Sequence, residues 1–315
     1  MKLFNYKKIK TKLDLLLLKR NFKRKTKVEK DEWFFIFGYG IGDFYLFLSF
    51  VEDFKNYNNV TNLSVGLLKS YQQQLIQVFD LKFSRVLEIQ SSDLQFCEEN
   101  IFCPGKPIVF HPEKFLKNSF LSSIGYKMIN LNDIYKFMLN IPIYSLNAVP
   151  KEQIQHTEMA KERFFRYGLN KESKIVLIAP HANSFDDSMF PFEFWEKLIW
   201  RLKDRGYKVL INTVTQKSQY EIIDGVVCVD FSLVEAISFV NLCGNFIGVR
   251  SGFCDLISSS NARKIILYPV FNWYSGSFFS GSSLVKMGLS SHNIYELELD
   301  TKQLKDREEE ILNIL

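Results

Sequence analysis

The chain has 315 residues, of which 47% are hydrophobic and 24% are charged, as in soluble globular proteins with one large or two medium domains. Its five cysteines are scattered and form no CxxC pair, which argues against a disulfide framework and against a zinc site. A reducing cytoplasm fits this cysteine usage.

Charge is concentrated at the start of the chain. Residues 1–30 form a basic arm with 12 Lys+Arg and 2 Asp+Glu, a balance of +10, whereas the rest carries about −5. The apolar stretch LLLL in this arm is too short for a secretory signal peptide. Basic residues beside LDLLLL favour contact with an anionic membrane surface, whereas a nucleic-acid site would spread them over a folded face. A solvated tail and a helix packed on the body are the alternatives.

The first half of the body alternates short apolar runs with longer amphipathic segments, which is typical of βα units and a parallel sheet. The apolar runs predict strands at 32–38, 60–68, 84–89 and 107–111. The amphipathic segments predict helices at 42–54, 71–81 and 131–141, the last capped by Asn130 or Asn132. The polar segment 142–158, bracketed by two prolines, is the predicted linker.

The second half continues the same alternation. It predicts strands at 173–180, 207–213, 225–230, 245–250 and 263–269. It predicts helices at 157–169, 190–206, 232–243, 251–260 and 301–315. We therefore expect an N-terminal domain over 31–145 and a C-terminal domain over 146–315, both Rossmann-like, with a ligand cleft between them at the carboxyl ends of the strands.

The stretch FGYGIGDFYLFLSF holds a single charged residue, Asp43, in the most apolar part of the chain. A carboxylate would be costly at the centre of a membrane span, and three glycines make a poor helix centre. A strand, a turn and a helix explain this stretch better than a membrane span does. Gly40 and Gly42 would let the backbone approach a ligand, and Asp43 would begin the helix, where the dipole favours a carboxylate. A simple helix cap is the alternative role for Asp43.

Residues 37–54 resemble the opening motif of the heptosyltransferase-like glycosyltransferases, glycosyltransferase family nine, in which a glycine-rich turn ends in Gly-Asp before an apolar helix. Residues 174–211 and 231–269 resemble two further blocks of that family, so the resemblance covers about 32–270. It implies an α/β fold of the GT-B type, with two Rossmann-like domains facing a central cleft. Two departures stand out: RSGFCD places Arg250 and Asp255 where the family has aspartate and histidine.

The resemblance implies that Asp43 is the catalytic base that takes a proton from an acceptor hydroxyl. The donor diphosphate would lie against Ser251 and Gly252 at a helix start, and Arg250 would add a phosphate contact. Asp255 would bind a donor sugar hydroxyl or hold Arg250, and a simple Arg250–Asp255 ion pair is the alternative for both. No metal is expected at the leaving group, since arginine and N–H dipoles supply the positive charge.

The loop APHANSFDD follows the first strand of the second domain and offers His181, Asn183 and Ser184 as further donor contacts. Asp186 and Asp187 in this loop fit a solvated loop better than a metal site. Glu235 is predicted either to bind ribose hydroxyls or to be an ordinary acid in the first turn of a helix. His111 and the aromatic stretch 271–279 are weaker candidates, the latter for stacking or for core packing.

These features predict a cytoplasmic glycosyltransferase, peripheral on the inner face of the membrane, that moves a sugar from a nucleotide-sugar donor to a surface glycan, free or lipid-linked. Lipopolysaccharide, O-antigen and capsule are the expected acceptor classes, inversion the expected outcome, and neither a cofactor nor a nucleic-acid partner is expected. A nucleotide-sugar epimerase and a catalytically silent GT-B-like binding protein are the alternatives.

Overall fold

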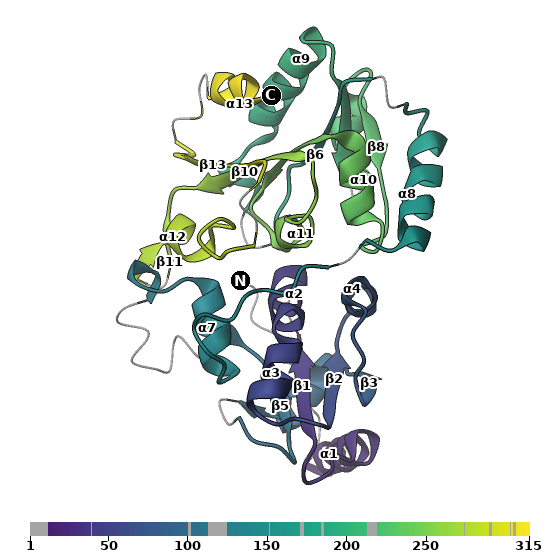
Figure 1. Cartoon of the computed structure of the whole chain (residues 1–315), viewed down its shortest axis with the longest axis vertical. Coiled ribbons are helices and arrows are strands. Elements are labelled where there is room, and N and C mark those ends of the chain that lie inside the picture. Colours follow the sequence, from purple (N-terminus) through teal and green to yellow (C-terminus); the bar gives the residue numbers. More distant parts are fainter. Residues whose placement is uncertain are drawn as a thin grey trace.

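A computed structural model of the chain describes residues 12–38, 40–99, 102–112, 125–150, 152–170, 173–183, 186–212, 219–273, 275–289, 292–302, 304 and 307–315. Two lobes lie one above the other, each built on a parallel sheet (Figure 1). The N-terminal lobe holds the first sheet and the C-terminal lobe the second. Both predicted Rossmann-like sheets are therefore confirmed.

The first sheet has the strand order β3-β2-β1-β5-β4, with every pair parallel. Its strands are β1 (Trp33–Phe37), β2 (Leu63–Leu67), β3 (Arg85–Glu88), β4 (Glu98–Glu99) and β5 (Pro107–Val109). Its helical elements are α1 (Lys12–Thr26), α2 (Ile41–Ser49), α3 (Val51–Tyr57), α4 (Gln72–Phe79), η1 (Ser91–Phe96), η2 (Gly125–Lys127) and α7 (Leu131–Met138).

Successive residues of β1 point to opposite faces of the sheet, and both faces are covered. Phe35 and Phe37 pack in the cluster that includes α2 and α3, whereas Phe34 and Ile36 pack in the cluster that includes Phe22 of α1. This two-sided burial explains why the apolar run that begins at Trp33 is a strand. Within the described ranges, no helix combines the length and apolar character that a membrane span requires.

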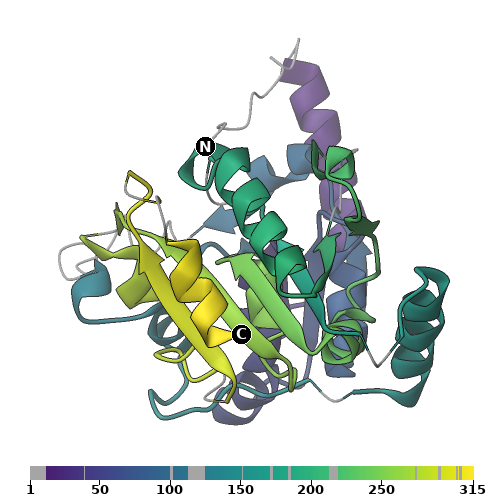
Figure 2. The ribbon, with the colours of Figure 1, turned by 90° about the horizontal axis from the view of Figure 1, so that it is seen from above.

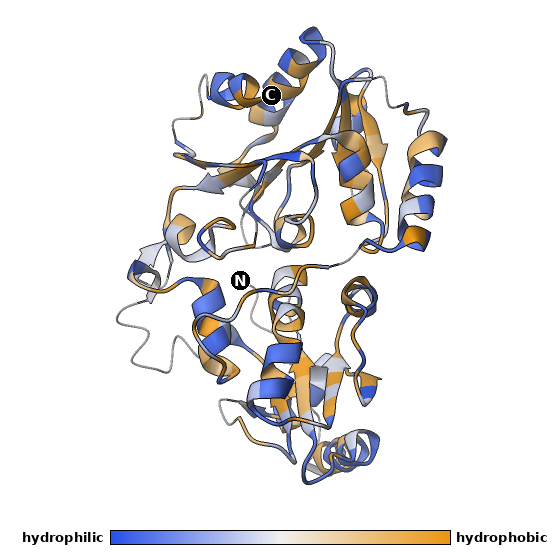
Figure 3. Ribbon diagram, viewed as in Figure 1, coloured by the Kyte–Doolittle hydropathy of each residue, from blue (hydrophilic) through white to orange (hydrophobic). Residues whose placement is uncertain are grey.

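The second sheet has the order β13-β10-β9-β6-β7-β8, again with every pair parallel. Its strands are β6 (Ile175–Ala179), β7 (Lys208–Asn212), β8 (Val227–Val229), β9 (Asn245–Val249), β10 (Arg263–Pro269) and β13 (Ile294–Leu299). Numbered along the lobe, this is the order 3-2-1-4-5-6 of the doubly wound nucleotide-binding fold. Apolar strands run through the centre of both lobes (Figure 3).

The remaining elements surround this sheet. They are α8 (Ile154–Arg166), η3 (Asp187–Met189), α9 (Phe192–Asp204), η4 (Gln219–Ile222), α10 (Ala236–Cys243), α11 (Gly252–Leu256), the hairpin β11 (Asn272–Trp273) and β12 (Gly276–Ser277), α12 (Phe278–Ser282) and α13 (Glu308–Ile314). α9 and α13 bury one face of the sheet, and α10, α11 and α12 bury the other. α8 packs outside α10, on the C-terminal side of the linker (Figures 1 and 2).

Several predicted boundaries were wrong. The helix predicted over 42–54 is two helices, α2 and α3, that meet at Phe50. β4 and β13 were not predicted, and the final helix covers only Glu308–Ile314. α8 begins at Ile154, inside the predicted linker. Of the two predicted caps for α7, Asn130 is the one used: its side chain accepts from the Asp133 N–H, completing a capping box.

The predicted basic arm is a packed helix over the part that the structure describes. α1 docks on the first sheet through Phe22 and Thr26, both 2% exposed, and Lys25 forms an ion pair of 4.0 Å with Asp93 of η1. The alternative of a helix packed on the body is therefore observed for Lys12–Thr26. Residues 1–11 lie outside the described part of the chain.

Candidate active site at the meeting of the two lobes

Each sheet has a point at which the strand order reverses. In the first sheet it lies between β1 and β5, and in the second between β6 and β9. Open α/β sheets bind ligands at this point, beyond the carboxyl ends of the strands. The loops that leave β1, β6 and β9 carry most of the predicted site residues: Gly40, Gly42, Asp43, His181, Asn183, Arg250, Ser251 and Gly252.

Asp43 lies in the first turn of α2, directly after β1. Gly40 is the N-cap residue of this helix, with φ −65°, so Asp43 is the third helical residue and not the cap. The carboxylate is partly buried, and at the start of a helix it is stabilised by the dipole.

Tyr135 of α7 holds the Asp43 side chain in place. Its hydroxyl donates to Asp43 Oδ1 at 3.0 Å and lies 2.9 Å from the Asp43 carbonyl oxygen. Tyr135 is fully buried, so its ring fixes the position of the hydroxyl. Tyr71 lies within reach of the Asp43 charge: burial raises the pKa of Tyr71, and this charge raises it further. Neither tyrosine lies near Asp43 in the chain, so neither contact can be predicted from the sequence.

The first turn of α2 also meets the C-terminal lobe. A Cβ atom on Gly252 would lie 2.1 Å from the Gly42 nitrogen, and a Cβ on Gly42 would lie 2.6 Å from Asp255 Oδ2. Only glycine fits at either position, because backbone stands against backbone. The close approach predicted for Gly42 is therefore an approach to the other lobe, and it brings the loops after β1 and β9 together.

Arg250 and Asp255 form a buried ion pair behind this contact. Arg250 donates to Asp255 Oδ1 at 2.7 Å and Oδ2 at 3.1 Å, and also to the carbonyl oxygens of Ser282 and Ser251. The two side chains are 5% and 2% exposed. Burial disfavours the charged guanidinium, but the Asp255 carboxylate outweighs it and raises the pKa of Arg250.

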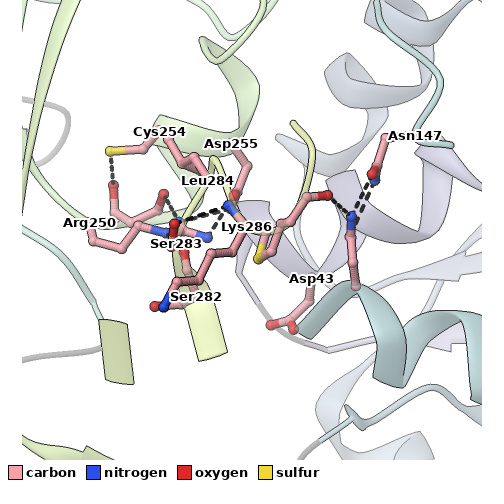
Figure 4. Close-up of polar contacts among 12 residues, drawn as sticks. Asp43, Asn147, Arg250, Cys254, Asp255, Ser282, Ser283, Leu284 and Lys286 are labelled. Atoms are coloured by element: carbon pink, nitrogen blue, oxygen red, sulfur yellow. Dashed lines mark hydrogen bonds and ion pairs between the residues drawn. The ribbon is translucent and has the colours of Figure 1, made fainter. Parts of the chain in front are cut away.

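The ion pair is the alternative that the sequence analysis names for both Arg250 and Asp255. The donors of this guanidinium are directed at Asp255, Ser251 and Ser282, and Figure 4 shows the pair embedded among Ser282, Ser283 and Leu284. Asp43 lies beside this cluster, on the N-terminal lobe. Arg250 and Asp255 therefore shape the loop that carries Ser251 and Gly252, which itself lies at the surface between the lobes.

The loop after β6 is open to solvent. His181 and Asn183 are exposed, with the His181 ring 5.9 Å from the ring of Tyr220, while Ser184 lies outside the described residues. Asp186 caps η3 by accepting from the Ser188 N–H at 2.9 Å, and this hydrogen bond lowers the Asp186 pKa. No group of His, Cys, Asp and Glu side chains suited to a metal ion occurs in the described part of the chain.

Contacts along α7 and the linker bind the lobes further. Asn130 donates to the Lys286 carbonyl oxygen at 3.2 Å, and Asn132 donates to the Met287 carbonyl oxygen. Asn147 of the linker donates to Ser49 Oγ of α2 at 2.8 Å and is paired with Asn132 (Figure 4). The helix that positions Asp43 through Tyr135 is thus anchored to the C-terminal lobe.

The two weaker candidates of the sequence are His111 and the aromatic stretch 271–279. His111 follows β5 and is partly buried, at the same sheet edge as Asp43. In the stretch 271–279, Phe271 stacks on Phe278 at 4.9 Å and Trp273 stacks on Phe278 at 5.4 Å. Phe278 is buried, so this aromatic group forms a packed cluster.

Glu235 is 1% exposed. Arg163 of α8 donates to its two oxygens at 2.7 and 3.1 Å, and the Ser232 N–H donates at 2.9 Å. The carboxylate is therefore engaged by protein groups, which favours the predicted alternative of an ordinary helix acid, here at the N-cap of α10. Burial raises the pKa of Glu235, but the Arg163 and Ser232 hydrogen bonds outweigh burial and lower it from its usual 4.5.

We expect Glu235→Gln to lower the free energy of unfolding by about 2 kcal/mol at neutral pH, because it breaks a buried ion pair whose arginine is partly exposed. Since the folded pKa is depressed, the stabilisation is complete above about pH 4.5 and is lost as the pH falls through the folded value. Urea unfolding at several pH values measures this. Glu158→Gln, which removes an exposed ion pair with Lys161, should change little; equal effects of the two variants would refute the argument.

No protein-family model matches the chain, and no curated protein sequence matches it. The solved structures that match the chain include two family members that cover most of it. A glycosyl transferase family 9 protein from Veillonella parvula DSM 2008 is 13% identical, with 91% of this chain and 97% of that chain covered and a TM-score of 0.58. The E. coli ADP-heptose lps heptosyltransferase II is 11% identical, with 89% and 96% covered and a TM-score of 0.63. The chain therefore has the GT-B fold that its resemblance to glycosyltransferase family nine predicted.

Proposed function

We propose that the protein is a glycosyltransferase that moves a sugar from a nucleotide-sugar donor to a bacterial surface glycan, with inversion at the anomeric carbon. The observation that carries the proposal is the place of Asp43. It is a partly buried carboxylate, held by Tyr135, at the strand-order reversal of one lobe and beside the corresponding loop of the other. The GT-B fold and the solved family 9 and heptosyltransferase relatives support the same reaction class.

Inverting transfer requires a base on the acceptor side. The oxygen of the acceptor hydroxyl attacks the anomeric carbon, the bond from that carbon to the diphosphate oxygen breaks, and the hydroxyl proton passes to Asp43. A carboxylate at this place suits the role because Tyr135 orients it before substrate arrives. The nucleoside diphosphate leaves with the bonding electrons.

The departing diphosphate needs positive partners. The N-terminus of α2 offers backbone N–H groups and the positive end of a helix dipole. Gly252 lies against this turn, next to Ser251. His181 and Asn183 lie on the loop after β6, at the carboxyl end of that strand. We propose these four residues, with Gly40 and Gly42, as the donor-binding set. The proposal includes no metal ion or cofactor.

The acceptor class is proposed from the name of one solved structure with the same fold. The name of the E. coli enzyme gives ADP-heptose as donor and lipopolysaccharide as the glycan. We propose lipopolysaccharide, O-antigen or capsule as the acceptor class here, and the cytoplasmic face of the membrane as the place of reaction. Arg250 and Asp255 replace the family's usual residues at the loop after β9. The ligand panel described next therefore serves to identify the sugar and the nucleobase of the donor.

The test is the melting temperature of the full chain with a panel of nucleotide sugars and free nucleotides. A donor at a hundred times its Kd stabilises the folded state by about 2.7 kcal/mol, which raises the melting temperature by on the order of 5 °C. One nucleotide family should give this shift, while the matching free sugars give none. A folded sample that responds to no nucleotide would contradict the proposal and favour a silent GT-B-like protein.

A further inference from the structure

Helix α1 lies on the side of the N-terminal lobe remote from the C-terminal lobe. Figure 1 shows it at the far end of the molecule, and Figure 2 shows it extending beyond the sheets. Only one side of α1 packs on the protein: Phe22 and Thr26 are buried, while Lys19, Arg20 and Lys23 are exposed. The helix thus presents a long face to its surroundings.

This exposed face is uniformly basic. Five cations lie along it beside Leu16: Lys19, Arg20, Lys23, Arg24 and Lys27. Within the described residues, none of these five forms an ion pair. The neighbouring Lys25 of α1 does form one, with Asp93. Five like charges on one face repel each other, a cost that an anionic partner relieves.

The same helix exposes leucines. Leu15, Leu16 and Leu17 are 38%, 57% and 49% exposed, respectively. A leucine among these cations would stay in water beside the phosphate backbone of a nucleic acid, so it would add little binding free energy there. At a lipid surface the same leucine leaves water by shallow insertion among the headgroups, which favours binding. Proteins that bind nucleic-acid strands instead combine basic residues with aromatic rings, and the row from Leu15 to Lys27 exposes no aromatic side chain.

We propose that α1 is a docking face for an anionic lipid surface, with Lys19, Arg20, Lys23, Arg24 and Lys27 contacting headgroups and Leu16 and Leu17 inserted between them. Docking through α1 places the N-terminal lobe next to the membrane and the C-terminal lobe away from it. The inference is independent of the transfer reaction, since none of these residues belongs to the candidate active site.

The experiment is co-sedimentation of the full chain with phosphatidylcholine vesicles that contain or lack phosphatidylglycerol. Binding is expected only to the anionic vesicles and should weaken as salt is added. Replacing the five cations by glutamine should reduce the affinity by on the order of 10³-fold, since each basic residue near an anionic surface contributes about fivefold. The matched control replaces five exposed cations elsewhere on the protein by glutamine: Lys69, Lys82, Arg166, Lys174 and Lys302. That variant should bind as the parent does.

A second variant separates lipid from nucleic acid. Leu16→Gln with Leu17→Gln keeps every charge of the face, so it should weaken vesicle binding and leave binding to a duplex DNA probe unchanged. The melting temperature of each variant verifies that it is folded. Absence of binding to anionic vesicles, equal losses in the two five-residue variants, or tighter binding to DNA than to vesicles would overturn the proposal.

Discussion

Asp43→Asn should reduce the release of nucleoside diphosphate from the bound nucleotide sugar by about 10²–10⁴-fold, the range expected for loss of a general base. The amide keeps the shape of the carboxylate and its oxygen can still accept the Tyr135 hydrogen bond, but it cannot take a proton. Donor affinity should therefore change little. Hydrolysis of the donor by water provides the assay, because water then replaces the acceptor hydroxyl and the acceptor need not be known.

The control for this variant is Asp53→Asn, which removes the carboxylate at the corresponding third position of α3, the next helix along the chain. It should retain the parent rate. A donor that raises the melting temperature of both variants alike would show that their binding sites are intact. If Asp43→Asn turned over donor at the parent rate, Asp43 would not be the base, although the protein would still bind nucleotide sugars.

Much of the fold could be predicted because buried parallel strands are continuous apolar runs. WFFIF and IVLIA are such runs, and the structure has β1 and β6 there. β13 escaped prediction because it lies at the edge of its sheet, where Glu296 and Glu298 alternate with apolar residues. Glu296 has a structural task there, since it accepts from Ser283 Oγ at 2.5 Å and from the Leu284 N–H at 2.7 Å.

The candidate site was only partly predictable, for a different reason. Asp43 stood out because a lone charge in an apolar run needs an explanation. Tyr135 gave no comparable signal: it is one aromatic residue in an amphipathic helix, and only the fold brings its hydroxyl to Asp43. For Arg250 the ion pair with Asp255 was one of the two predicted roles, because the two residues lie five apart in the chain. The partner of Glu235, Arg163, lies 72 residues away and could not be predicted.

The meeting of Gly42 and Gly252 was equally invisible in the sequence, because the two residues belong to different lobes. Each glycine was expected to let the backbone approach a ligand, and in the structure each also lets the two lobes approach each other. The consequence is that the loop after β1 and the loop after β9 form one surface. Asp43 and Ser251 then belong to a single site only while the lobes stay in this contact.

Gly252→Ala should therefore destabilise the protein by about 2–3 kcal/mol, at the upper end of the range for overpacking. The new Cβ would lie 2.1 Å from the Gly42 nitrogen and 2.8 Å from its Cα, and backbone atoms cannot turn aside as a side chain does. Relief requires the lobes to separate, so donor hydrolysis should fall together with the melting temperature. Thermal unfolding and the donor assay measure the two effects.

Gly40→Ala is the matched control for stability. A Cβ at Gly40 meets no atom within 4 Å, and its φ of −65° suits alanine. This substitution should leave the melting temperature unchanged or raise it slightly, because alanine restricts the unfolded chain. If Gly252→Ala proved as stable as Gly40→Ala, the first turn of α2 would not pack on α11 in solution. The lobes would then stand further apart, and Asp43 would need a substrate-driven closure to reach the loop after β9.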